Sequence, residues 1–250
     1  MSANSPVAIP FLTDPERRRH LRHWMVLCAI GGVGIGRRAD ALSLGDLSQQ
    51  DAAQGLRGAL EKGAEVAVQL LGREDGFWGN DKVRIPLPEW LVKAEKVIKL
   101  IGRSQDIDAL KVGVNRAAEQ AVPQAKKLLV DAVKAMNVQD AKAILTGGDD
   151  SVTAFFRDKT RAPLTERFLP VVSAVTGKIG LAQQYNSLAA QVQKSGLVKL
   201  SADQANVERH VTTKALDGLY WMIGEEERKL RQNPAGAASA IVRKVFGSLR

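Results

Sequence analysis

A pair of glycines followed by a pair of aspartates is the first segment whose residue types could do chemistry. Asp149 and Asp150 come directly after Gly147 and Gly148 in a chain of 250 residues. Two neighbouring carboxylates can bind a hard cation or act as an acid and a base. At the start of a helix they would instead accept hydrogen bonds from unpaired backbone N–H groups. We expect helix capping here, because Asp is preferred at that position and the spaced ligands of a calcium loop are missing from the sequence.

Asn115, Arg116 and Glu119 form a second candidate site on a helix that we predict over residues 104–122. Asn115 and Glu119 are four residues apart and therefore share one face of that helix. If this face is buried, the ionised Glu119 needs a partner there, and a buried polar network would mark a pocket. If the face is exposed, the three residues form an ordinary helix surface.

A third candidate lies on a long helix that we predict over residues 203–232. Asp217 is followed there by Tyr220 and Trp221. Aromatic side chains beside a carboxylate can line a ligand site, so these residues stay candidates for ligand binding.

The same predicted helix continues into a run of charged residues. Its spacing pairs Glu225 with Lys229 and Glu227 with Arg231. Each pair stabilises a helix by about 0.2–0.5 kcal/mol. This structural role is sufficient to explain the run.

Three lysines form a basic strip on a helix that we predict over residues 89–101. The strip consists of Lys93, Lys96 and Lys99. It is either an ordinary solvated helix face or a contact for anionic headgroups or an acidic partner.

Composition excludes several classes of protein and of site. With 45% hydrophobic and 25% charged residues, the chain is neither disordered nor collagen-like. It has one cysteine, Cys28, and of its three histidines only His210 lies beyond residue 41. We find no P-loop, Rossmann, HExxH or G-x-S-x-G motif, and we predict no cofactor and no metal. The net charge is +9, but residues 1–41 hold six basic and three acidic residues, so residues 42–250 carry only +6. This charge is modest and dispersed, and export would separate the protein from nucleic acid, so we expect no nucleic-acid partner.

The first 41 residues have the order of an export signal. An arginine-rich start is followed by an uncharged stretch over residues 24–36 and by small residues for cleavage near Ala41. The uncharged stretch is too short for a membrane span of about 20 residues. Adjacent arginines resemble a twin-arginine signal, but His20 stands where that consensus usually has Phe, so the general export route stays open. The other reading is a basic tail on a cytoplasmic protein. The arginine-rich start of this segment consists of Arg17, Arg18, Arg19 and Arg22.

Residues 42–250 show helical spacing of apolar residues throughout and predict one all-α bundle of eight to ten helices. No segment alternates with a period of two, so we expect no significant sheet, and we expect no transmembrane span. Phe77 and Trp78 are expected to pin an irregular stretch over residues 73–88, unless that stretch is a lid over a pocket. Pro123 is expected to start a new turn or a kink, and Pro163 and Pro170 to interrupt a helical segment. The main helices are predicted over residues 46–71, 89–101, 104–122, 181–194, 203–232 and 237–246.

Seven motifs, taken in order, resemble the domain-of-unknown-function family DUF4197. They are SLGDLSQQDAAQGLRGALEKGAEVAVQLL, DKVRIPLP, NRAAEQAVPQA, DAKAILTGGDD, YNSLA, KALDGLYWMIGEEERKLRQNP and KVFG. Val114 stands where we would expect Met. The resemblance covers nearly all of residues 42–250 and implies a bacterial, exported, all-helical protein, but it carries over no activity or cofactor. The polar residues in these motifs either line a shared pocket or cap helices and form hydrogen bonds in the core. These residues are Arg84, Asn115, Arg116, Glu119, Asp149, Asp150, Asp217 and Glu225.

We therefore expect an exported, periplasmic helical protein that binds a small ligand or an envelope partner without catalysis. Those eight residues and Tyr220 are its ligand-binding candidates, and the basic strip is its candidate contact for anionic headgroups. One alternative is a purely structural envelope protein. The other is a hydrolase or lyase, which requires two carboxylates within about 5–10 Å across one cleft. Its acid and base would come from Glu119, Asp149, Asp150, Asp217 and Glu225.

Overall fold

The computed structural model describes residues 44–100, 102–139, 141–194 and 206–249. Backbone contacts divide the chain into two units, Met1–Asp40 and Ala41–Arg250, and every described residue belongs to the second. The predicted export signal over residues 1–41 lies outside the described residues.

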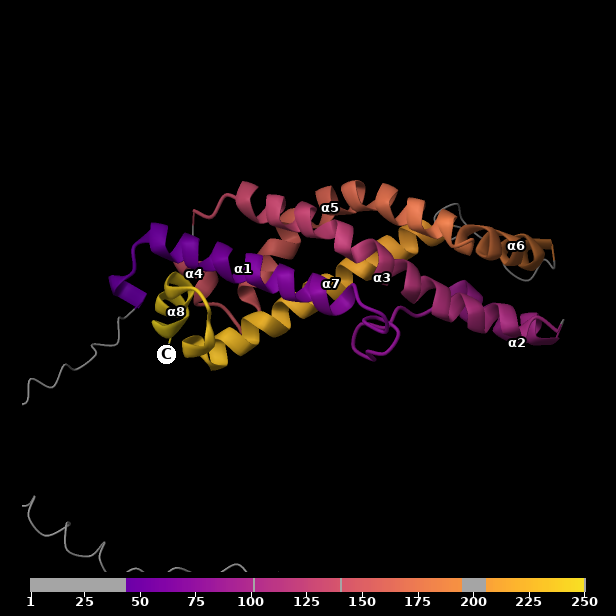
Figure 1. Ribbon diagram of the computed structural model, residues 1–250, viewed down its shortest axis with the longest axis horizontal. Helices are drawn as coiled ribbons and strands as arrows, with labels where there is room; N and C mark the ends of the chain where they lie inside the picture. Colours follow the sequence, from indigo (N-terminus) through magenta and orange to yellow (C-terminus); the bar gives the residue numbers. More distant parts are fainter. Residues whose placement is uncertain (1–43, 101, 140, 195–205, 250) are drawn as a thin grey trace, which may run out of the picture. The chain divides into compact units, whose positions relative to one another are not determined.

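All regular structure in the described residues is helical, which confirms the predicted all-α bundle (Figure 1). These residues contain no strand. Two short 3-10 helices lie at Leu44–Asp46 (η2) and Pro234–Gly236 (η3). The α-helices are α1 (Gln49–Leu71), α2 (Glu89–Leu100), α3 (Ser104–Ala135), α4 (Ala141–Leu145), α5 (Ser151–Lys178), α6 (Leu181–Lys194), α7 (Val207–Gln232) and α8 (Ala240–Gly247).

Local sequence signals set several helix ends. The hydroxyl of Ser48 accepts a hydrogen bond from the Asp51 N–H at 2.9 Å and so caps α1, as the spacing predicts. Gly72 ends the same helix. Asn206 caps α7 by accepting from the Arg209 N–H at 2.7 Å. α1 begins three residues later than predicted, because residues 44–46 form the separate 3-10 helix.

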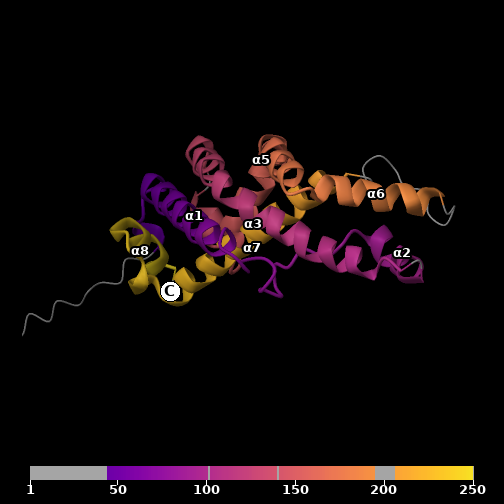
Figure 2. The ribbon, with the colours of Figure 1, turned by 45° about the vertical axis from the view of Figure 1, so that its right-hand side comes forward.

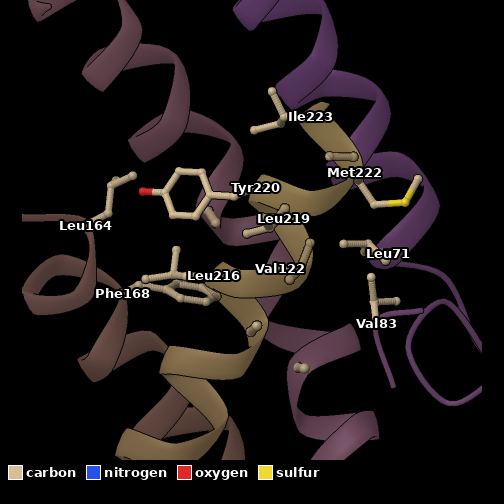
Figure 3. Packing of buried hydrophobic residues seen from close by; sticks show 14 of the residues in the cluster. Leu71, Val83, Val122, Leu164, Phe168, Leu216, Leu219, Tyr220, Met222 and Ile223 are labelled. Atoms are coloured by element: carbon tan, nitrogen blue, oxygen red, sulfur yellow. The ribbon is translucent and has the colours of Figure 1, made fainter. Parts of the chain in front are cut away.

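The core lies where α1, α3, α5 and α7 pack together, with α8 beside α1 (Figures 1 and 2). α7 packs against neighbours on two sides. Figure 3 shows Tyr220 pointing from α7 toward Leu164 of α5, while Met222 points toward Leu71 of α1. The apolar face predicted for α1 is buried along its whole length, and it consists of Leu56, Leu60, Ala64, Ala67 and Leu71.

Three prolines lie inside helices that continue through them, so the predicted interruptions at Pro163 and Pro170 are wrong, and Pro123 does not start a new helix. A kink at Pro123, the other outcome predicted there, stays a prediction. A proline inside a helix costs about 3 kcal/mol, because it removes one hydrogen bond and crowds the preceding turn. Packing offsets this cost in α5. Its buried face runs across both prolines as Leu164, Phe168, Val172 and Val175.

The close approach of α1 to α8 depends on Gly55. A Cβ atom at this position would lie 2.5 Å from Val245. Replacing Gly55 with Leu should lower the free energy of unfolding by about 1–3 kcal/mol, the usual cost of overpacking a core. Urea denaturation followed by helical circular dichroism measures the loss.

Gly177→Leu is the matched control for this substitution. A Cβ atom at Gly177 has no neighbour within 4 Å, and Leu is a better helix former than Gly. This variant should be neutral or slightly more stable. An equal loss of stability in both variants would contradict the close contact of α1 with α8.

Candidate functional site

Asn115 is buried on α3 and binds the backbone of the irregular stretch over residues 73–88. Its Oδ1 accepts from the Ile85 N–H at 2.8 Å, and its Nδ2 donates to the Ile85 carbonyl at 3.0 Å. Nδ2 also donates to the Lys111 carbonyl at 2.8 Å. One side-chain amide therefore pairs with both polar groups of Ile85, as a neighbouring strand would.

Glu119 lies one turn further along α3 and holds the other end of the same stretch. Its Oε1 accepts from the N–H groups of Phe77 and Trp78, both at 3.0 Å, and its Oε2 accepts from Arg116 at 2.7 Å. Arg116 also reaches Asp75 at 2.8 Å. The pKa of Arg116 is raised, mainly by the hydrogen bond to Glu119. The face is buried and Glu119 has its partner, as expected, but the network holds backbone and lines none of the cavities described below.

Arg84 folds back onto the same stretch. Its Nε donates to the Trp78 carbonyl at 2.7 Å, and its guanidinium lies 5.2 Å from the centre of the Trp78 ring. Phe77 is fully buried, which confirms its predicted role as an anchor. Arg84 also lines a hollow of about 230 Å³ together with Asp217 and Trp221.

The two aspartates after Gly148 do not cap α5 with their side chains. Asp149 is exposed. Asp150 occupies the N-cap position without a side-chain cap, and its Oδ2 lies 3.8 Å from Arg228 instead. The predicted capping by these side chains is therefore wrong, because a carboxylate from α7 takes that place.

Glu227 is that carboxylate. The sequence spacing predicts for it only an ion pair with Arg231 on the same helix. It is buried and accepts from the N–H groups of Val152 at 3.1 Å and Thr153 at 2.8 Å, the first turn of α5. Arg231 donates to it at 3.0 and 2.8 Å, which confirms the predicted spacing. The spacing of Glu227 and Arg231 was the only sign of this role in the sequence, because the contact of Glu227 with α5 spans more than 70 residues.

The other predicted pair, Glu225 with Lys229, is wrong. Glu225 binds Arg228, three residues on, and Lys229 binds Glu226 at 2.6 Å. Residues three apart on a helix are neighbours just as residues four apart are, so both registers were available.

A pocket of about 470 Å³ lies between α5 and α7, and we call it the arginine pocket. It brings together three of the predicted site residues, Asp150, Asp217 and Tyr220. Sequence reasoning missed its arginines, although Arg157 and Arg161 stand four apart on α5, and Asp217, Trp221 and Arg228 follow one face of α7. The full lining is Asp150, Thr153, Ala154, Arg157, Arg161, Asp217, Tyr220, Trp221, Gly224 and Arg228.

The guanidiniums of this pocket keep most of their hydrogen-bond donors available. A guanidinium offers five N–H donors. Among the described residues, Arg161 donates only to Asp217, and Arg157 has only Asp158 nearby, at 3.5 Å. Arg231 is the contrast, because its Nε, Nη1 and Nη2 bind Glu227, the Leu145 carbonyl at 2.9 Å and the Ser151 hydroxyl at 2.8 Å.

Tyr220 contributes its ring to the pocket, because its hydroxyl is already engaged. The hydroxyl lies 2.9 Å from Thr160 Oγ1. Thr160 donates its own hydrogen to the Phe156 carbonyl at 2.6 Å, so Tyr220 is the donor in their bond. Burial raises the pKa of Tyr220, which therefore stays protonated.

The arginine pocket can bind an anion, and its carboxylates form contacts with its arginines. Asp217 accepts from Arg161, and Asp150 lies beside Arg228. Among the residues that the structure describes, no three His, Cys, Asp or Glu side chains lie together in a way that could hold a metal ion. None of the described helices is both long and apolar enough to cross a membrane.

The basic strip on α2 is partly neutralised by its own helix. Lys93 lies 4.0 Å from Glu89, and Lys99 lies 2.9 Å from Glu95. The hydrogen bonds from Lys99 and Lys111 lower the pKa of Glu95. Lys96 is exposed. The net positive charge of this helix face is therefore smaller than three lysines suggest.

Comparison with known proteins gives one match. A family model described as "Protein of unknown function (DUF4197)" matches residues 46–247, which confirms the resemblance noted in the motifs. No curated protein and no solved structure matches the chain.

Replacing Glu119 with Leu should lower the free energy of unfolding by about 3–5 kcal/mol, the usual cost of removing one partner of a buried ion pair. It should also speed trypsin cleavage after Arg73, Lys82 or Arg84, because the N–H groups of Phe77 and Trp78 lose their acceptor. Denaturation and timed proteolysis measure both effects. Glu74→Leu removes an exposed carboxylate that lies 3.5 Å from Arg116 and should change neither. Unchanged cleavage in the Glu119 variant would show that the stretch is held by other contacts.

His210 gives the fold a pH dependence. Its Nε2 donates to the Pro86 carbonyl at 2.8 Å, and burial lowers its pKa below the ordinary 6.5. Between the folded and the unfolded pKa, His210 is protonated in the unfolded chain but not in the folded chain. The free energy of unfolding therefore falls as the pH drops below about 6.5 toward the folded pKa. Measuring unfolding at pH 7.5 and 5.5 should show this loss. His210→Gln keeps a donor but has no proton to bind, so its loss over the same range should be smaller. An identical pH profile would contradict this role.

Proposed function

This chain belongs to the DUF4197 family, and we propose that it is an exported helical protein that binds a small anionic ligand in the arginine pocket without transforming it. The observation that carries the proposal is the set of three guanidiniums in one pocket, Arg157, Arg161 and Arg228. Their donors are only partly used by the described residues.

The chemistry of the pocket favours a carboxylate or a phosphate group. A guanidinium presents a planar fork of donors that matches the oxygens of either group. Trp221 and the ring of Tyr220 add an aromatic wall for the remainder of the ligand. A volume of about 470 Å³ lies within the range of roughly 300–1,000 Å³ of small-molecule sites. We therefore propose a small organic acid or phosphate ester as the ligand.

The carboxylates of the pocket support binding rather than hydrolysis. Asp217 accepts from Arg161, and Asp150 lies 3.8 Å from Arg228. A carboxylate that accepts a hydrogen bond from a guanidinium orients that guanidinium, and this role suits an anion site.

Export is the second part of the proposal, and the sequence supports it. Residues 17–22 hold the arginine-rich start, and the segment ends in small residues near Ala41. Beyond residue 41 the chain has no cysteine, which suits an oxidising compartment such as the periplasm. We propose the twin-arginine route because the arginines are adjacent and the apolar stretch is interrupted by glycines.

Native mass spectrometry of the protein purified from its own envelope fraction tests both parts. We expect a chain that begins at Leu42 and carries a bound component that dissociates on activation in the gas phase. An uncleaved chain would overturn export. A mature chain without any adduct would overturn ligand binding and favour a structural role.

The Arg157→Gln variant tests whether the ligand binds in the arginine pocket. Hydrogen bonds to charged groups contribute about 1.5–3 kcal/mol, so the variant should lose about 10- to 100-fold in affinity and show little or no adduct. Arg73→Gln is the matched control, because Arg73 is exposed and lies outside this pocket. Equal adduct in both variants would place the ligand elsewhere.

A further inference from the structure

A second cavity, of about 630 Å³, lies where the end of α3, the following connection and α4 meet the middle of α5. We call it the α3–α5 cavity. It contains none of the residues that carry the proposed anion site in the arginine pocket. Its volume also falls within the usual range of small-molecule sites.

The inner wall of this cavity is apolar. Met136 and Leu164 line it and are buried, and Ile144 and Phe155 are half-buried against the core. Figure 3 shows Leu164 on α5 next to the ring of Tyr220. Thr160 also lines the cavity, but its hydroxyl is used by the Phe156 carbonyl and by Tyr220. The wall therefore offers hydrocarbon contact and no free hydroxyl.

Two cations stand at the rim of the cavity, on the same face of α5. Phe155, Lys159, Pro163 and Arg167 follow one another at intervals of four residues and all line it. Lys159 and Arg167 are exposed, and neither forms a salt bridge among the described residues. The nearby carboxylate of Asp131 is paired with Lys127 at 2.6 Å, and its pKa is lowered mainly by that hydrogen bond and to a smaller extent by Arg167. Lys159 instead lies 5.8 Å from the centre of the Phe155 ring. Eight residues of helix separate the two cations by about 12 Å along the axis.

We propose that the α3–α5 cavity binds a single-chain fatty-acid anion, with its hydrocarbon chain against Met136 and Leu164 and its carboxylate held at the rim by Lys159 and Arg167. Charge complementarity decides this occupant. A neutral lipid or an apolar peptide would bring no negative charge to Lys159 and Arg167, whereas a carboxylate forms ion pairs with them. Each methylene removed from water contributes about 0.8 kcal/mol, so an apolar chain gives the affinity and the carboxylate gives the orientation.

Isothermal titration of the full chain with decanoate tests the proposal, and decanamide is the neutral probe of equal chain length. Decanoate should bind with one-to-one stoichiometry, and decanamide at least about 10-fold more weakly. The double variant Lys159→Gln/Arg167→Gln should lose about 10-fold or more in affinity for decanoate. Lys96→Gln/Lys178→Gln removes the same charge from exposed positions outside the cavity and should bind like the unaltered protein.

A second variant tests the cavity itself. Ala135 is exposed and lines the cavity, so Ala135→Trp should fill it without disturbing the core, which an unchanged thermal melt would show. This variant should abolish decanoate binding. Arg157→Gln should leave decanoate binding unchanged, which separates this site from the arginine pocket. Equal binding of decanoate and decanamide, retained binding in Ala135→Trp, or no saturable binding at all would overturn the proposal.

Discussion

The junction of α5 with α7 depends on the buried carboxylate of Glu227. Its oxygens accept from the first N–H groups of α5, at Val152 and Thr153, which have no acceptor within their own helix. Its negative charge also faces the positive end of the α5 dipole, and Arg231 balances that charge. The start of α5 is thereby held at one turn of α7. Because the helix is rigid, this contact also places Arg157 and Arg161 opposite Asp217, where they enclose the arginine pocket.

The same device occurs at Glu119, where a carboxylate with an arginine partner binds two backbone N–H groups of another segment. A buried ion pair of this kind adds little net stability compared with hydrocarbon, but the loss of one partner is costly. Its main contribution is therefore to define which segment lies where. This separates the arginines into two groups by their contacts. Arg116 and Arg231 use their donors within the fold, whereas Arg157 and Arg161 use few, which is the physical basis for placing ligand binding at the second group.

Periodicity predicted the helices and their buried faces well, because both follow from local spacing. The shared face of Asn115 and Glu119 was predicted for the same reason. What these side chains bind was not predictable, since Ile85 and Phe77 are 30 and 42 residues away and reach α3 only in the folded chain. The prediction that Asp150 caps α5 with its side chain was wrong for a related reason. The local preference favours Asp150, but Glu227, which is distant in the sequence, accepts the hydrogen bonds of the first turn of α5 instead. Pro163 and Pro170 show the same limit of local prediction. Proline disfavours a helix interior, but the packing of α5 outweighs this preference.

The two cavities share one hydrogen bond in their walls. Thr160 lines the α3–α5 cavity, Tyr220 lines the arginine pocket, and their hydroxyls are 2.9 Å apart. Burial keeps Tyr220 protonated as the donor, and Thr160 passes its own hydrogen to the Phe156 carbonyl. α5 supplies both sites from two of its faces, with Arg157 and Arg161 toward α7 and with Lys159 and Arg167 toward the end of α3. A shift of α5 along α7 would therefore change both cavities at once. The hydrogen bonds that oppose such a shift are those of Glu227 with the start of α5, of Arg161 with Asp217 and of Thr160 with Tyr220.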